Sequence, residues 1–355
     1  MPTSTRRTTT RLGATALTTA ALTVVGLLAV PGQVSAGPRN LLPRQCTGDA
    51  PVVCHFDVPP GNYTVTALLG GDTAGSTDIT AETRRTMLAE TPTEAGRKVL
   101  RSFTVNVREP EGQPTGPAGS PGLDLTFGGS APRLAGLHVA PARRAPQILL
   151  AGDSTVCDQW REPYTGWGQE LPQFLRGRAA VANHADGGES TQSFLDEPVF
   201  FDALEAEIRR GDLVLIQLAH NDKATTSEQY RANLTEMAER VRARDGKPVF
   251  VTPIVRRRFH RDGTLNSVAL HVMKADLPME MRALAAELNV PLVDLTAMTK
   301  ELVEGLGVEA SKALYLHGDT ISDNTHTSEY GAARFARLVA DDLRSQRLLP
   351  GRYVR

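Results

Sequence analysis

The sequence predicts an α/β protein with a central parallel sheet flanked by helices, preceded by a smaller all-β sandwich domain. Two observations carry this prediction. Short runs of alternating apolar and polar residues, separated by Pro-Gly and Gly-Gly turns, occupy residues 52–140. After residue 145, apolar β-branched runs alternate with amphipathic helical patterns, which is the order of parallel strands joined by right-handed helical crossovers. A chain of 355 residues is long enough for both parts.

The N-terminal segment predicts export. The stretch MPTSTRRTTTR carries three arginines and no acid, and it is followed by an apolar run and the small residues QVSAG. This pattern predicts a signal peptide over residues 1–36, cleaved after Ala36. A retained membrane anchor is the alternative, although threonines interrupt the apolar run, and the Arg6-Arg7 pair leaves twin-arginine export open. We expect a secreted protein without stable membrane association once the signal is removed.

Charge and cysteine usage agree with this interpretation. The 39 basic residues nearly balance the 40 acidic ones, so no basic field favours a nucleic-acid partner, and we expect a monomer. Cys46 and Cys54 lie eight positions apart in a loop-rich segment, which predicts a disulfide outside the cytoplasm. Cys157 is left over and is interpreted as a small buried side chain in the first turn of a helix rather than as a reactive thiol.

The sandwich domain is predicted over residues 40–142. Its expected strands lie in the runs CHFDVPPGNYTVTALLGG, SFTVNVRE, LDLTFGG and AGLHVAPA. The Pro- and Gly-rich segment from Glu109 to Gly122 predicts a mobile surface loop.

The second domain is predicted over residues 145–350. Five apolar runs are expected to form its buried parallel strands: QILLAGDST, AAVANHADGG, DLVLIQLAHND, KPVFVTPIV and VPLVDLT. Four segments are expected to form helices: GWGQELPQFLRG, SEQYRANLTEMAERVRARDG, LPMEMRALAAELN and SEYGAARFARLVADDLRSQ.

Polar clusters follow three of these strands, where ligands bind in open α/β sheets. One of them contains Ser154, which the pattern places between a strand and a helix. A serine there is either a helix N-cap or a nucleophile aimed from the helix N-terminus. Asp323 and His326 precede the last predicted helix, with a spacing that lets the aspartate orient the imidazole while the imidazole takes the serine proton. Their alternative is a capping carboxylate and a surface histidine.

Two further strand ends offer donors to an oxyanion. These are the backbone N–H of Gly188 and the side-chain amide of Asn221. The adjacent Gly187 leaves the register of the first donor open by one residue, and either glycine could serve only a tight turn. Asn221 has an Asx turn as its alternative.

These four blocks together resemble the SGNH (GDSL-type) hydrolase family over residues 147–344. The blocks are GDST, NHADGGES, AHND and DNTH, and the flanking TGWGQELPQF and DNTHTSEYGA resemble the rhamnogalacturonan acetylesterase branch. The segments PPGNYTVT and LDLTF resemble galactose-binding-like sandwich domains that accompany some secreted members. The resemblance implies a three-layer SGNH fold for the second domain.

The resemblance also implies residue roles, which coincide with those argued above. Ser154 would be the nucleophile, His326 the general base and acid, and Asp323 its orienting partner, with the backbone of Ser154, Gly188 and Asn221 forming the oxyanion hole. The glycine block often reads Gly-Arg-Ser in this branch, whereas this chain has Glu189 after the glycine, which puts a preference for acidic pectin in doubt.

The expected activity is therefore removal of O-acetyl groups from a polysaccharide, with pectic rhamnogalacturonan as the expected polymer and no cofactor. The alternatives are a lipase, phospholipase or thioesterase of the same superfamily, and an inactive carbohydrate-binding protein. Trp167, Glu189 and His220 are expected to contact substrate, and Trp160 is a candidate to stack on a sugar, with core packing as the alternative for both tryptophans. A metal site at the histidines is not favoured, because no metal-binding helix spacing occurs. His317 to Asp319 is expected to form a solvated turn.

Overall fold

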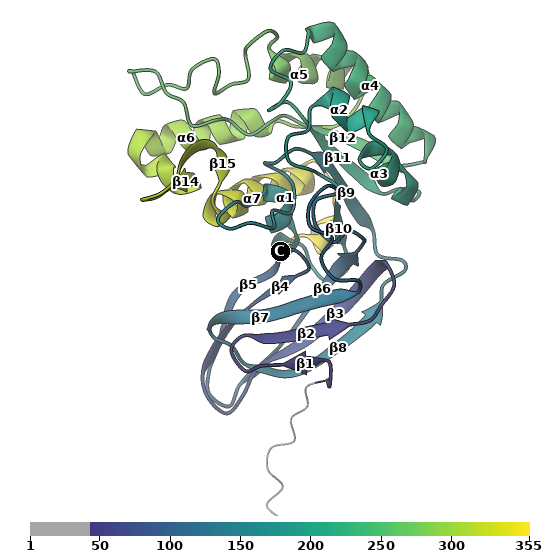
Figure 1. Cartoon of the computed structure of the whole chain (residues 1–355), viewed down its shortest axis with the longest axis vertical. Helices are drawn as coiled ribbons and strands as arrows, with labels where there is room; N and C mark the ends of the chain where they lie inside the picture. Colours follow the sequence, from purple (N-terminus) through teal and green to yellow (C-terminus); the bar gives the residue numbers. More distant parts are fainter. Residues whose placement is uncertain (1–42) are drawn as a thin grey trace, which may run out of the picture. The chain divides into compact units, whose positions relative to one another are not determined.

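An antiparallel β-sandwich forms the first part of the described chain. The computed structural model describes residues 43–355, so the predicted signal peptide lies outside the described residues. One sheet has the strand order β1-β2-β7-β4-β5 and the other β6-β3-β8 (Figure 1). The strands are β1 Cys46–Thr47, β2 Val52–Phe56, β3 Gly61–Gly70, β4 Gly75–Ala81, β5 Arg85–Thr93, β6 Lys98–Val107, β7 Leu123–Ala131 and β8 Leu134–Pro141. Side chains such as Val65 and Phe103 from one sheet and Leu125 and Phe127 from the other share one buried core.

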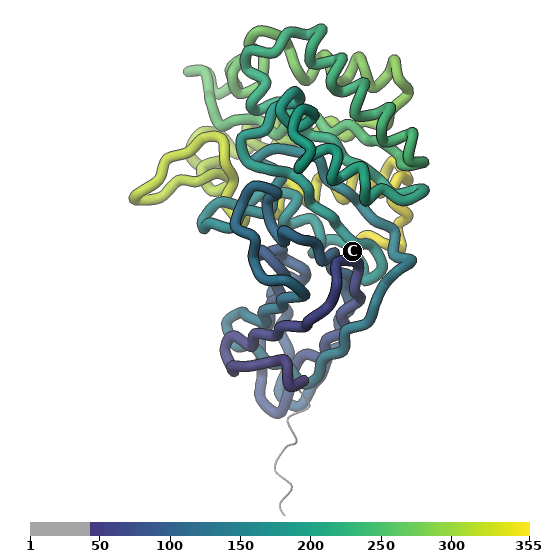
Figure 2. The backbone as a smooth tube through the Cα atoms, turned by 45° about the vertical axis from the view of Figure 1, so that its right-hand side comes forward, coloured from purple at the N-terminus to yellow at the C-terminus, as the bar shows by residue number. Residues whose placement is uncertain are grey.

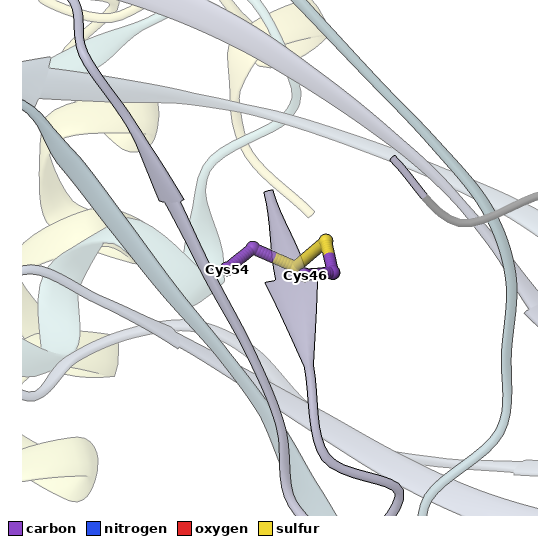
Figure 3. Close-up of a disulfide and its surroundings, with 2 residues drawn as sticks. All are labelled: Cys46 and Cys54. Atoms are coloured by element: carbon purple, nitrogen blue, oxygen red, sulfur yellow. A yellow bond between two sulfur atoms is a disulfide. The ribbon is translucent and has the colours of Figure 1, made fainter. Parts of the chain in front are cut away.

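The predicted disulfide between Cys46 and Cys54 is confirmed (Figure 3). The two cysteines are direct partners in the antiparallel register of β1 and β2. The sequence pattern missed β1, β4 and β5, because these strands carry many polar residues and lack a clean alternation.

The second part is the expected α/β layer with five parallel strands. Its order is β10-β9-β11-β12-β13, and every predicted strand run contributes one strand. Strands β9 to β12 are labelled in Figure 1. The strands are β9 Gln147–Gly152, β10 Ala180–Asn183, β11 Leu213–Gln217, β12 Lys247–Val251 and β13 Leu292–Val293. The central strands β9 and β11 are buried on both faces, as apolar runs of this kind require.

Helices cover both faces of this sheet, which makes three layers. The helices are α1 Trp167–Glu170, α2 Thr191–Asp196, α3 Phe201–Glu207, α4 Ser227–Ala243, α5 Leu277–Glu287, α6 Leu295–Ala310 and α7 Glu329–Ser345. Alternate residues of β9 face opposite layers. Ile148 and Leu150 pack with side chains of α1, α6 and α7, whereas Leu149 and Ala151 pack with those of α2 to α5.

Three helices and one β-hairpin of this layer were not predicted. They are α2, α3, α6 and a hairpin of β14 Tyr315–His317 with β15 Ser322–Thr327. The hairpin contains His317 to Asp319, the residues expected to form a solvated turn, and it places Asp323 and His326 on a strand rather than in a turn.

The backbone tube in Figure 2 follows the chain from the purple sandwich strands to the yellow C-terminal helix α7.

The sandwich and the α/β layer are hydrogen-bonded to each other within one compact unit. Asn62 on β3 donates to the side-chain oxygen of Gln147 on β9 over 2.8 Å, and Gln169 on α1 donates to the carbonyl of Thr83 over 2.9 Å. The domain limits 40–142 and 145–350 stay predictions. Within the described residues, no helix has the length and apolar character needed to cross a membrane.

Candidate active site

Ser154 lies in a tight turn directly after β9. The prediction that it opens a helix is wrong, because Ser154 to Val156 form a single turn and helix α1 begins only at Trp167. The turn is closed by Val156 N–H and Cys157 N–H, which both donate to the carbonyl of Asp153. The capping side chain is Asp153, whose carboxylate accepts from the backbone N–H of Thr155 over 2.9 Å and from its hydroxyl over 2.7 Å. The Ser154 hydroxyl is therefore left available for chemistry.

His326 binds that hydroxyl and is in turn bound by Asp323. The Ser154 Oγ lies 2.9 Å from His326 Nε2, and His326 Nδ1 lies 2.6 Å from Asp323 Oδ2. A carboxylate only accepts, so Nδ1 carries the imidazole proton and the serine hydroxyl donates to Nε2. This is the arrangement in which an imidazole can remove the proton of an attacking serine.

The Asp323 carboxylate is held ionised. Burial alone would raise its pKa, but hydrogen bonds from the His326 ring and from the backbone N–H groups of Thr325 and His326 outweigh burial and lower the pKa to about 2. The two backbone bonds measure 2.7 Å and 3.1 Å. A carboxylate fixed in this way keeps the imidazole in one orientation and favours its protonated form during reaction.

Two arginines after β12 hold the strand that carries these residues. Arg256 donates to the Thr325 hydroxyl and to the His220 carbonyl, both over 2.8 Å. Arg257 donates from its backbone and its guanidinium to Asn324 over 2.7 Å and 2.9 Å. The Asp-His block is thereby tied to the strand end that carries Asn221.

The segment NHADGGES, residues 183–190, is the glycine block, and residues 153–157 are the serine turn. The two lie side by side, since a Cβ on Gly187 would be 3.8 Å from the Ser154 Cβ. Gly187 N–H donates to the side-chain oxygen of Gln113 over 2.8 Å, so this amide is already occupied. Gly188 has a φ of +95°, in the region that favours glycine, and its N–H has no acceptor within the described chain. Of the two glycine amides, that of Gly188 is the one without an acceptor among residues 43–355, which favours Gly188 over Gly187 as the predicted oxyanion donor.

Asn221 has its side-chain amide near the same block. One N–H of the amide donates to the Glu189 carbonyl over 2.9 Å, which ties the glycine block to the end of β11. A primary amide has a second N–H, which remains for an oxyanion. The assignment of Ser154, Gly188 and Asn221 as the oxyanion hole stays a prediction.

The expectation that His220 contacts substrate is wrong. Its side chain is 2% exposed and lies behind the serine turn, where Nδ1 is 3.2 Å from Asp153 Oδ2 and the ring packs edge-on against His271 at 4.4 Å. Burial lowers the pKa of His220, which favours the neutral ring at neutral pH. Burial would raise the pKa of Asp153, but His220 and the hydrogen bonds from Thr155 lower it to about 2. This buried pair supports the turn that presents Ser154.

The expectation that Trp167 lines a sugar site is wrong as well. The indole is 1% exposed, belongs to the core under α7, and donates from Nε1 to Gln217 Oε1 over 2.9 Å. Trp160 is the accessible tryptophan, with 54% of its surface exposed. In the same loop, the Tyr164 ring lies edge-on to the His326 ring at 5.3 Å. Glu189 is partly buried, which raises the pKa of its carboxyl.

Three further residues near these strand ends, Asp222, His184 and Cys157, lie in structural positions. Asp222 accepts from the backbone and hydroxyl of Thr191 at the start of α2. The His184 side chain is buried, and its Nε2 lies 3.5 Å from Glu207 Oε2. Burial lowers the pKa of the His184 imidazole. Cys157 is buried in the serine turn, and burial raises the pKa of its thiol well above the ordinary value. Across residues 43–355, no group of three or more His, Cys, Asp or Glu side chains is arranged to hold a metal ion.

The fold and this constellation define a serine ester hydrolase, and the chain belongs to the GDSL-like Lipase/Acylhydrolase family, whose model matches residues 150–343. It is 41% identical over 212 residues to rhamnogalacturonan acetylesterase RhgT of Bacillus subtilis, a match covering 56% of this chain and 89% of the relative. It is 31% identical over 209 residues to the probable rhamnogalacturonan acetylesterase YesY of the same organism, covering 56% of this chain and 93% of the relative.

The crystal structure of protein YxiM from Bacillus subtilis shares the fold over much of the chain. The match has a TM-score of 0.53 at 23% identity and covers 83% of this chain and 80% of the other. The expected SGNH architecture behind an N-terminal antiparallel β region is thereby confirmed.

The sequence pattern missed the side chains that the sandwich supplies around the site. Gln113 reaches the glycine block, and Arg84 donates to the carbonyls of Gln159 and Tyr164, both over 3.1 Å. The segment Glu109–Gly122 was expected to be a mobile surface loop, yet Gly112 and Gln113 are buried. No local pattern signals such contacts, since they join residues about 70 to 80 positions apart.

Proposed function

We propose that this chain is a secreted carbohydrate esterase that removes O-acetyl groups from pectic rhamnogalacturonan. The observation that carries the ester chemistry is the hydrogen-bonded series Ser154–His326–Asp323. The similarity to RhgT supports the polymer, since that relative is a rhamnogalacturonan acetylesterase. The disulfide in the sandwich supports export, because such bonds persist in oxidising compartments.

The proposed reaction has two halves. Ser154 Oγ attacks the acetyl carbonyl carbon while its proton passes to His326 Nε2, and the carbonyl oxygen becomes an oxyanion facing the N–H groups of Ser154, Gly188 and Asn221. The intermediate collapses to an acetyl-enzyme as the sugar oxygen leaves with the proton from His326. A water molecule then loses a proton to His326 and attacks the acetyl carbon, which releases acetate and returns the proton to Ser154.

Acetate release tests this proposal. The full protein is incubated with acetylated rhamnogalacturonan, homogalacturonan, xylan and chitin fragments, with Ser154→Ala as the control. We expect the fastest release from rhamnogalacturonan and a loss of roughly 10³-fold or more in Ser154→Ala. Full activity of Ser154→Ala would refute the mechanism, and faster release from another polymer would refute the substrate.

A second assay separates deacetylation from lipid or thioester hydrolysis. Nitrophenyl esters of increasing acyl length are compared, and we expect the highest kcat/KM at acetyl. A maximum beyond octanoyl would favour a lipase or thioesterase instead. For export, the N-terminal sequence of the protein recovered from culture medium should begin at Gly37, and recovery only from the cell interior would contradict secretion.

A further inference from the structure

The connection between β6 and β7 links the sandwich to the candidate active site. We define residues 108–122 as the sandwich loop. Within it, Gly112 and Gln113 are buried, whereas the following residues of the tip are largely exposed. The Arg108 guanidinium at its base is also buried and contacts the carbonyls of Gly112 and Asn183, the second of which ends β10. The loop is therefore fixed against the α/β layer at the strand that leads into the glycine block.

Gln113 is linked to both backbone segments of the expected oxyanion hole, to the first directly and to the second through Gln159. Its side-chain oxygen accepts from Gly187 N–H over 2.8 Å. Its side-chain nitrogen lies 3.5 Å from Gln159 Oε1, and Gln159 donates to the Ser154 carbonyl over 2.8 Å. One side chain from the sandwich thus joins the glycine block directly and the serine turn through Gln159.

The glycine block needs such a contact to hold its shape. Two consecutive glycines allow wide rotation of the backbone, and Gly188 adopts a positive φ with no atom near the position of a Cβ. The hydrogen bond to Gln113 fixes the peptide that precedes Gly187, next to the amide expected to face the oxyanion. A Cβ on Gly187 would lie 3.0 Å from Gln113 Oε1 and 3.8 Å from the Ser154 Cβ, so the three residues are closely packed.

A donor stabilises an oxyanion only if it is held in position before the charge develops. We propose that Gln113, supplied by the β-sandwich, is a positioning residue that aims the Gly188 N–H at the oxyanion, so that the sandwich completes the active site. This inference rests on the proposed ester hydrolysis and deepens it, because it assigns the sandwich a part in the reaction itself.

The test is Gln113→Met, which keeps the length of the side chain and removes the amide acceptor and donor. The matched control is Glu111→Met in the same loop, which loses a hydrogen bond from the Thr83 hydroxyl on the side facing the sandwich. For both variants kcat and KM on nitrophenyl acetate and the Tm are measured. We expect kcat of Gln113→Met to fall about tenfold, with KM and the pH profile unchanged, because the donor acts mainly in the transition state. Glu111→Met should keep kcat within about twofold.

The outcomes separate this inference from the proposed function. If wild-type protein hydrolyses the ester and Ser154→Ala does not, but Gln113→Met retains full kcat, the positioning role is refuted while the ester hydrolase stands. The positioning role is also refuted if Gln113→Met and Glu111→Met lose the same factor in kcat and the same number of degrees in Tm. That result would show that both substitutions merely loosen the loop. If Gln113→Met does not fold, Gln113→Ala replaces it, because alanine also removes the acceptor for Gly187 N–H while demanding less space, and it should lower kcat with little change in KM. An unchanged kcat in Gln113→Ala refutes the proposal.

Discussion

A buried ion pair joins the sandwich to the loop after the nucleophile, and its removal should destabilise the whole unit. Arg85 on β5 is 1% exposed and Asp158 is fully buried, with Arg85 Nε 2.7 Å from Asp158 Oδ2. The same guanidinium donates to the carbonyls of Asn106 over 2.7 Å and Glu111 over 3.0 Å. Asp158 also accepts from the Asn183 amide over 2.7 Å. We predict the effect of Arg85→Met.

The expected loss follows from what the substitution leaves behind. Breaking one side of a buried ion pair costs about 3–5 kcal/mol, because the remaining Asp158 charge is buried without its counter-charge. Two carbonyls also lose their donors, at about 1–3 kcal/mol each, and these costs overlap. A loss of at least about 4 kcal/mol is therefore expected, which is a large part of the ~5–15 kcal/mol that stabilises a typical protein. The double variant Arg85→Met/Asp158→Asn should recover about 2 kcal/mol, since no buried charge is left unpaired.

Urea unfolding followed by circular dichroism measures the free energy of unfolding for each variant. Lys300→Met is the control, because its ion pair with Glu304 is nearly half exposed on the lysine side and should contribute less than about 1 kcal/mol. A loss below about 1 kcal/mol for Arg85→Met would refute the reasoning. So would a double variant whose loss equals the sum of the two single variants.

Three further outcomes are expected. Burial raises the pKa of Glu170 to about 8 from 4.5, so its contribution to stability is complete below pH 4.5 and is lost as the pH rises through 8. Glu170→Gln should therefore raise Tm relative to wild type at pH 8.5 but not at pH 4.5, and equal Tm differences at both pH values would contradict this. Asp323→Asn should lower kcat about 10³-fold or more with little change in KM, because the imidazole of His326 loses its orienting carboxylate; a kcat within tenfold of wild type would exclude the assigned role. Replacing Cys46 and Cys54 by serine should lower the free energy of unfolding by about 2.5 kcal/mol, as expected for closure of a short loop, and leave kcat unchanged. A fall in kcat without a fall in the free energy of unfolding would contradict this prediction.

Local sequence pattern determines the parallel sheet and the position of its polar strand ends. The five apolar runs are long enough to be recognised singly, and parallel strands bring their carboxyl ends to one edge of the sheet. For this reason Ser154, Gly188 and Asn221 are recognisable as strand-end residues from the sequence alone. The Asp323-x-x-His326 spacing is recognisable because both members lie within one short segment.

Tertiary structure decides which side chains face the cleft and which lie in the core. Trp167 and His220 are polar-tipped residues near the motifs, yet both are buried, because their orientation depends on partners 50 and 67 positions away, Gln217 and Asp153. The contacts between the sandwich and the candidate active site are also long-range, so the local sequence pattern does not indicate them. Gln113 sits in a Pro- and Gly-rich loop whose composition indicates only a turn, and its burial against Gly187 arises from the packing of two separate regions of the chain. Periodicity and spacing specify local conformation, whereas long-range contacts determine how a side chain is buried and what it binds.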